Sequence, residues 1–233
     1  MSKVLCVSPA YNEEKTVSKV IEGALKSTDG IIVVDDGSMD NTREIAFKCR
    51  QERNGERLKI VGYDKNAGKG AAIRTGFLSA EGKFVVTIDS DLDVDPSLIP
   101  SYVRALKSND IAVASKWNPK SRTVMTSRRK VLSFGFNALS RLLTGIKLRD
   151  TQTGLKAFRR TVFERMAPKF LVERYAFDLE MMSACNHAGF KIVELPVNVH
   201  VESMVGFKEI LRMSRDMIEV AYRLRVKKYY QRN

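Results

Sequence analysis

Short apolar runs alternate with longer amphipathic stretches over the first half of the chain. Five of these runs are bounded by polar or turn residues and predict buried strands, at residues 4–7, 31–34, 58–61, 83–88 and 111–114. The stretches that separate them predict helices, at residues 13–26, 41–52, from 70 onward, and 96–107. Strands that alternate with helices in this way predict an α/β fold with a doubly wound, mainly parallel sheet.

After Trp117 the pattern predicts two amphipathic helices with basic flanks and, between them, one further helix and one strand. In chain order these elements lie at residues 128–146, 175–187, 191–195 and 206–226. We therefore expect a main domain over residues 1–203 and a basic amphipathic C-terminal helix over residues 204–233. No run reaches the ~18 apolar residues that would cross a bilayer, and the first residues lack the features of a signal peptide.

Composition and charge narrow the class of protein. The chain has 233 residues, of which 44% are hydrophobic, so it can bury a core and disorder is not expected. Its three cysteines lie far apart and predict neither a disulfide framework nor a zinc site. The formal net charge is +13, and residues 116–149 contain no Asp or Glu. So basic a protein usually meets a polyanion, such as a nucleic acid, an anionic membrane or a phosphorylated small molecule.

Carboxylate-rich turns follow three of the predicted strands. Because the carboxyl ends of parallel strands meet at one edge of a sheet, we expect these turns to form one site. Carboxylates packed as densely as Asp89, Asp91 and Asp93 stay ionised only beside a cation, and their hard oxygens suit Mg²⁺ or Mn²⁺. The turns lie at residues 11–13, 35–36 and 89–91.

A glycine-rich loop at residues 64–70 joins the third predicted strand to a helix. Its glycines and two lysines, placed at a helix N-terminus, are able to hold phosphate. It lacks the spacing of a P-loop, and no GxGxxG motif follows the first strand, which disfavours a nicotinamide cofactor.

These motifs, in this order, resemble the family 2 glycosyltransferases of the GT-A fold. The segments that carry the resemblance are PAYNEE (9–14), VVDDGSMDNT (33–42), NAGKG (66–70) and DSD (89–91). Three later segments are similar to the dolichyl-phosphate glucose and mannose synthases: DTQTGLK (150–156), FDLE (177–180) and ELPV (194–197).

Three positions depart from the pattern of that family. Ser90 stands where Ala often separates the two aspartates, and Asp93 stands where the mannose synthases often have Gln. Asp93 is still an oxygen donor, so metal binding is compatible with it. Lys116 stands where an Arg often follows the fifth strand, and it keeps the charge but not the bidentate grip of Arg.

The resemblance implies a metal-dependent, inverting transfer of a hexose from UDP-glucose or GDP-mannose to a polyprenyl phosphate. It implies Mg²⁺ or Mn²⁺ at Asp89, Asp91 and Asp93, with Asp91 also named as catalytic together with Lys116, Arg128 and Arg129. The expected donor-binding residues are Pro9, Tyr11, Glu13, Asp36, Lys69, Asp89, Ser90 and Gln152. The expected contacts to the acceptor phosphate are Lys116, Arg128, Arg129 and Lys208.

Arg128 and Arg129 cannot both point into one site, because neighbours on a helix diverge by ~100°. The acceptor is largely dianionic at neutral pH and needs positive charge rather than a general base. Its lipid tail implies a membrane partner, and the two amphipathic helices fit a lipid interface. The sequence thus predicts a cytoplasmic protein held peripherally on the cytosolic face of a membrane, in an oligomeric state that it does not specify.

Three other functions remain open on the sequence alone. A transferase acting on a glycan or other hydroxyl acceptor would need a base, for which Asp178 or another acidic residue is the candidate. A basic nucleic-acid-binding module is compatible with the charge, but the aromatic residues lie within apolar runs rather than in an exposed stacking platform, so no nucleic-acid partner is expected. A catalytically silent membrane scaffold would bind no nucleotide sugar.

Overall fold

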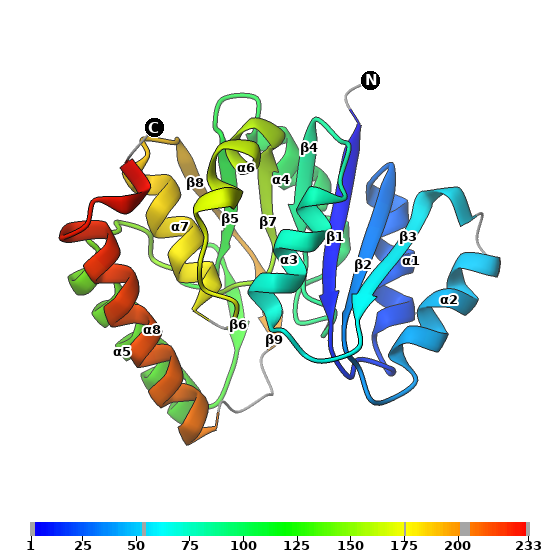
Figure 1. Cartoon of the computed structure of the whole chain (residues 1–233), viewed down its shortest axis with the longest axis horizontal. Coiled ribbons are helices and arrows are strands. Elements are labelled where there is room, and N and C mark those ends of the chain that lie inside the picture. The colour runs from blue at the N-terminus through cyan, green and yellow to red at the C-terminus, as the bar shows by residue number, and fades with distance from the viewer. Residues whose placement is uncertain (1–2, 53–54, 175, 201–205, 232–233) are drawn as a thin grey trace.

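The computed structural model describes residues 3–52, 55–174, 176–200 and 206–231 (Figure 1). Over the first half of the chain, strands and helices alternate as the sequence predicts. In chain order these elements are β1 (Val4–Ala10), α1 (Val17–Ser27), β2 (Gly30–Asp36), α2 (Thr42–Glu52), β3 (Leu58–Tyr63), α3 (Lys69–Leu78), β4 (Phe84–Thr87), α4 (Ile99–Ala105) and β5 (Ile111–Ser115).

The second half adds the two long helices and several strands. Its elements are β6 (Arg122–Val124), α5 (Ser127–Thr144), β7 (Lys156–Arg159), α6 (Arg160–Met166), α7 (Phe177–His187), β8 (Ile192–Pro196), β9 (Asn198–His200) and α8 (Phe207–Arg225). Both predicted amphipathic helices are present, as α5 and α8. Within the described residues no helix is long and apolar enough to cross a membrane.

Seven strands form one sheet in the order β3-β2-β1-β4-β7-β5-β8. All neighbouring pairs are parallel except those of β7, which runs antiparallel to both β4 and β5. The predicted doubly wound, mainly parallel sheet is confirmed, while β7 was not predicted. The short strands β6 and β9 form a separate parallel pair.

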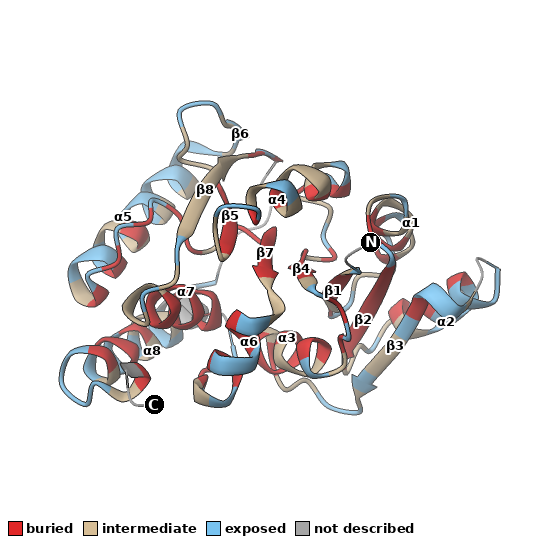
Figure 2. Ribbon diagram, turned by 90° about the horizontal axis from the view of Figure 1, so that it is seen from above, coloured by how far each residue is buried: buried red, intermediate tan, exposed pale blue. Residues whose placement is uncertain are grey.

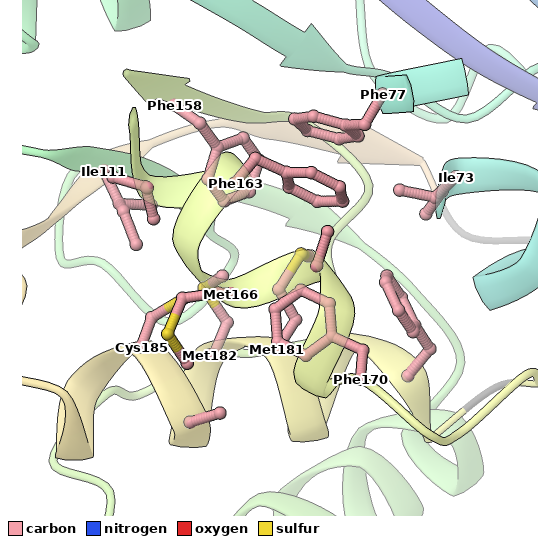
Figure 3. Packing of buried hydrophobic residues seen from close by; sticks show 14 of the residues in the cluster. Ile73, Phe77, Ile111, Phe158, Phe163, Met166, Phe170, Met181, Met182 and Cys185 are labelled. Carbon is pink, nitrogen blue, oxygen red and sulfur yellow. The ribbon is translucent and has the colours of Figure 1, made fainter. Parts of the chain in front are cut away.

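Helices cover both faces of the sheet, as the two views show (Figures 1 and 2). Strand β2 shows why: Ile31 and Val33 belong to the core under α1, α2 and α4, while Ile32 and Val34 belong to the core under α3, α6 and α7. Successive side chains of a strand point to opposite faces, so a strand that is apolar at every position is buried on both sides. The second core is rich in aromatic side chains, with Phe77 and Phe158 edge to face at a centroid distance of 5.4 Å (Figure 3).

The order in which strands are added to the sheet reverses next to β1. From β1 the chain moves outward through β2 and β3, and then returns to β4 on the other side of β1. In open α/β sheets the ligand site lies at such a point, outside the carboxyl ends of the strands. The helices α5 and α8 lie side by side and extend past the carboxyl ends of the strands (Figure 1).

Candidate active site

A cleft of about 860 Å³ lies at the carboxyl ends of β1, β2 and β4. Loops after these strands supply one part of its lining, and α5 and α8 supply another. The sequence-predicted site residues that line it are Pro9, Tyr11, Glu13, Asp36, Lys69, Asp89, Ser90, Asp91, Asp93, Lys116, Arg129 and Gln152.

Two residues that the sequence predicts to contact the acceptor phosphate are not among these lining residues. Arg128 is exposed and does not line the cleft, whereas its neighbour Arg129 does. The angle between consecutive helical positions explains this difference. The side chain of Lys208 lies outside the described part of the structure.

The loops after β1 and β2 brace each other. Asn12, in the left-handed region with φ 57°, accepts a hydrogen bond from the amide of Met39 at 2.8 Å. The amide of Glu13 donates to the hydroxyl of the buried Thr42 at 2.7 Å. These contacts fix the segment that presents Tyr11 and Glu13 at the cleft.

The amides of the glycine-rich loop are bound within the protein. Asp36 accepts hydrogen bonds from the amides of Ala67 (2.7 Å) and Gly68 (2.9 Å). The amides of Gly70 and Ala71 donate to the carbonyl of Glu173, at 2.7 and 3.2 Å. These four amides therefore already have protein acceptors, and the phosphate contact that the sequence predicts for the glycines and lysines of this loop stays a prediction.

Lys69 brings its charge from this loop into a buried ion-pair network. Its ammonium nitrogen lies 2.8 Å from Asp89 and 3.0 Å from Asp178. The other oxygen of Asp178 lies 2.7 Å from the ammonium of Lys156, whose side chain is almost fully buried. Burial alone would raise the pKa of Asp178, but the charges of Lys156 and Lys69 lower it. The network therefore holds Asp178 as a carboxylate with a lysine on each oxygen.

The turn after β4 concentrates negative charge. Enclosure in the cleft, and after it the charge of Asp89, raise the pKa of Asp91. Burial, followed by the charges of Asp91 and Asp89, raises the pKa of Asp93 to about 7. Between them Leu92 has φ 62°, a conformation that a bulky side chain rarely adopts and that usually marks a functional turn.

The carboxylates of this turn are suited to a divalent cation. One oxygen of Asp89 pairs with Lys69, while the other is buried and has no hydrogen-bond partner within the described residues. Gly154 permits this arrangement, since a Cβ there would lie 2.4 Å from Asp89 Oδ2. In the part of the chain that the structure describes, no three His, Cys, Asp or Glu side chains form a ready-made metal cage. A bound cation would thus need oxygens from its ligand as well, as Mg²⁺ commonly does.

Lys116 and Arg129 are the predicted cations that line the cleft. The ammonium of Lys116 lies 3.2 Å from the fully buried Asp150, which also accepts the backbone amide of Lys116 at 3.1 Å. Much of the Lys116 charge is therefore balanced within the protein. Arg129 is close enough to the acidic turn for its charge to lower the pKa of Asp93, against the raising effect of burial.

Several residues of the cleft were missed by the sequence analysis. Arg174 lines it and lies 3.4 Å from Asn66, and α8 contributes Arg212, Met213 and Asp216. Apolar side chains from both helices complete this part of the lining. No short-range pattern marks these residues, because their place depends on how α7 and α8 pack against the sheet.

Comparison with protein families agrees with this geometry. A family model described as Glycosyl transferase family 2 matches residues 6–167, which include every acidic turn of the cleft. The chain belongs to this family. It is therefore a glycosyltransferase, and the predicted resemblance is confirmed.

Two named glycosyltransferases are similar in sequence to most of this chain. The human dolichyl-phosphate beta-glucosyltransferase is 30% identical over 240 residues, which cover 93% of this chain and 74% of that protein. The glycosyltransferase AglD of Haloferax volcanii is 32% identical over 84% of this chain, a match that covers 33% of AglD.

Solved structures show the same fold. The glucosyl-3-phosphoglycerate synthase of Mycobacterium tuberculosis, in complex with UDP, is 22% identical and has a TM-score of 0.72 over 95% of this chain and 79% of that chain. A complex of the same synthase with Mn²⁺, UDP and glucosyl-3-phosphoglycerate also has a TM-score of 0.72, with 21% identity, over 95% of this chain and 79% of that chain. These similarities confirm the predicted GT-A fold.

Proposed function

We propose that this glycosyltransferase moves a hexose from a nucleotide-diphospho-sugar to a polyprenyl phosphate, with inversion at the anomeric carbon. One observation carries the proposal: a single cleft joins an acidic end, built by the turn after β4, to a wall from α5 and α8 whose side chains are mainly apolar or arginine, with one carboxylate, Asp216. Such a wall suits an acceptor with an anionic head and a hydrocarbon tail. The relatives named as dolichyl-phosphate beta-glucosyltransferases support this acceptor and favour UDP-glucose over GDP-mannose as donor.

The donor end of the cleft supplies the nucleotide and cation contacts in this proposal. The nucleoside would lie among Pro9, Tyr11, Glu13 and Asp36, at the ends of the first two strands. Asp89, Asp91 and Asp93 would hold Mg²⁺ or Mn²⁺ together with the diphosphate. That cation offsets the charge of the leaving nucleoside diphosphate. The complexes of the mycobacterial synthase with Mn²⁺ and UDP support a divalent cation at this end.

The acceptor end needs positive charge and no general base. Arg129 is the arginine of α5 that lines the cleft, and its guanidinium is suited to forked contact with a phosphate. Asp178, the candidate base for a hydroxyl acceptor, has a lysine on each carboxylate oxygen and a lowered pKa. A carboxylate held in this way is a poor proton acceptor, which argues against Asp178 as the base that a hydroxyl acceptor would need.

The direct test is a screen of nucleotide sugars with a polyprenyl phosphate and Mg²⁺ or Mn²⁺, with thin-layer separation of the glycolipid product. We expect a product with UDP-glucose. A product formed only on a glycan hydroxyl, with none on the lipid phosphate, would contradict the proposed acceptor.

Helix α5 supports a further part of the proposal, namely that α5 and α8 rest on a membrane. Its protein-facing side chains are small and polar: Asn137, Ser140 and Thr144 are buried. Its exposed side chains include Val131 and Leu142, each 71% exposed. A helix on the surface of a water-soluble protein buries its apolar side chains and exposes its polar ones. Helix α5 has the opposite arrangement, which suits a helix whose outer face meets lipid. Among the side chains of α8 that the structure describes, the large apolar ones that are exposed are Leu211, Ile218 and Tyr222. We propose that this surface lies on the cytosolic face of a membrane, flanked by the basic residues of both helices.

Replacing Phe134 and Leu142 by Glu should weaken binding to anionic vesicles by at least about tenfold, because each large apolar side chain contributes ~1.5–3 kcal/mol when buried. Both side chains are exposed on α5, so the variant should fold normally. The measurement is co-sedimentation with vesicles of mixed neutral and acidic lipids. Leu78→Glu is the matched control, since Leu78 is 76% exposed on α3 and should have no effect. If the double variant instead dissociates a dimer and keeps vesicle binding, the surface is a contact between copies of the chain.

Substituting Arg129 by Ala should slow transfer about ten- to a hundredfold, the equivalent of one charged hydrogen bond to the acceptor. The measurement uses a short, water-soluble prenyl phosphate, so that loss of membrane binding has no influence. Arg128→Ala is the control, because Arg128 is exposed outside the cleft, and its rate should stay near that of the wild type. Equal rates for the two variants would remove Arg129 from the acceptor site.

A further inference from the structure

The carboxylate of Glu180 lies fully buried in the first turn of α7 and joins distant parts of the chain. It accepts hydrogen bonds from the amides of Leu171 and Val172, each at 2.9 Å. It also accepts hydrogen bonds from the guanidinium of Arg223, near the end of α8, at 3.2 Å, and from the hydroxyl of Tyr230 at 2.5 Å. One buried carboxylate therefore ties the C-terminal segment to the chain just before α7.

The segment held by Glu180 supports the loop that carries Lys69. Directly after the two tethered amides, the carbonyl of Glu173 accepts the amides of Gly70 and Ala71. The approach is so close that a Cβ at Gly68, where φ is 108°, would lie 2.4 Å from the same carbonyl oxygen. The loop is thus in backbone contact with the Glu180-tethered segment, with no side chain between them.

We define residues 66–71 as the donor loop. Its other side is held by Asp36, which accepts the amides of Ala67 and Gly68. The loop is clamped between the end of β2 and the segment before α7, and it places Lys69 beside Asp89 at the acidic end of the cleft. A shift of either clamp would move the Lys69 ammonium relative to that turn.

We infer that Arg223 and Tyr230 are positioning residues for the donor loop, acting through Glu180. Neither residue lines the cleft, so neither would contact the donor. This inference rests on the proposed function only in naming the nucleotide-diphospho-sugar as the ligand that the loop serves. Its physical basis is the cost of a buried carboxylate: Glu180 stays in place while its hydrogen bonds are complete, and removal of one leaves the group undersatisfied.

Tyr230→Phe removes one hydroxyl from Glu180 and should weaken binding of UDP, in the presence of Mn²⁺, by about three- to tenfold. This is less than the loss of a direct charged contact, because the effect passes through the loop. In steady-state assays the KM for the donor should rise by the same factor, while the KM for the lipid phosphate stays unchanged. A role in stability alone would lower the melting temperature and leave the donor KM at its wild-type value.

Tyr229→Phe is the matched control, because Tyr229 lies in the same short turn and its hydroxyl does not contact Glu180. Amide hydrogen exchange gives a readout that needs no ligand: Tyr230→Phe should speed exchange at Ala67, Gly68, Gly70 and Ala71, and Tyr229→Phe should not. Faster exchange with no UDP binding by the wild type would refute the proposed donor but keep the positioning role. Unchanged exchange at these amides would overturn the inference itself.

Discussion

Asp91→Asn is expected to reduce glycosyl transfer by at least about a thousandfold, since a cation at the leaving diphosphate supplies several kcal/mol of transition-state stabilisation. Asp91 is exposed to the cleft, so the variant should keep the melting temperature of the wild type. Burial and, after it, the charge of the neighbouring aspartates raise the pKa values of Asp91 and Asp93, and a divalent cation would offset this crowded charge. The measurements are turnover and thermal unfolding, with and without EDTA.

Asp95→Asn provides the control in the same acidic stretch. Asp95 does not line the cleft; its carboxylate accepts the amide of Ser97 at 2.8 Å and caps a short helical turn. Asn is an equally good cap, so this variant should be fully active. EDTA should abolish wild-type activity, and Mg²⁺ or Mn²⁺ should restore it. Full turnover in excess EDTA would contradict the metal-dependent mechanism.

Asp178→Asn is expected to destabilise the fold by about 3–5 kcal/mol, because it leaves the buried Lys156 without its anion. For a chain of this size that corresponds to a fall in melting temperature of roughly 6–20 °C. The measurement is thermal unfolding followed by circular dichroism. A second substitution, Lys156→Met, removes the stranded charge and should recover part of the loss, so the double variant should melt above Asp178→Asn alone.

The same variant tests Asp178 as the base that a hydroxyl acceptor would need. If Asp178 were a general base for a hydroxyl acceptor, Asp178→Asn would lose activity while its melting temperature stayed within about 2 °C of the wild type. If Asp178 is instead an ion-pair partner of Lys69 and Lys156, Asp178→Asn lowers the melting temperature. Its activity, measured at a temperature where the variant is folded, then falls only because Lys69 is displaced.

The sequence predicted the part of the fold that local patterns determine. The run at residues 31–34 is apolar on every position, which is characteristic of a central parallel strand, and β2 is such a strand. Strand β7 left no comparable signal, because Lys156 and Arg159 stand at its ends. Its place follows from pairing with β4 and β5, and its Lys156 is tolerated in the core only because Asp178 neutralises it.

The same distinction holds for the site. Acidic turns after parallel strands meet by topology, so Asp36, Asp89 and Asp91 could be brought together from the sequence. The partners of the glycine-rich loop could not, since its amides are taken by Asp36 and by the carbonyl of Glu173, over 100 residues further along the chain. Arg174 was missed for the same reason: a basic residue in a loop has no periodicity that would reveal the cleft.

Strand β7 also has a consequence for how the protein is made. Strands β4 and β5 have no direct pairing in the sheet order, and β7 lies between them. The ribosome delivers both long before it delivers β7, so a nascent chain carries unpaired edges on β4 and β5, which are prone to pair with other chains. The donor-binding half, although it holds most of the acidic motifs, therefore has no complete sheet of its own. Synthesis must pass residue 159 before β4 and β5 can be joined into one sheet, and an interruption before that point would leave an aggregation-prone fragment rather than a smaller working domain.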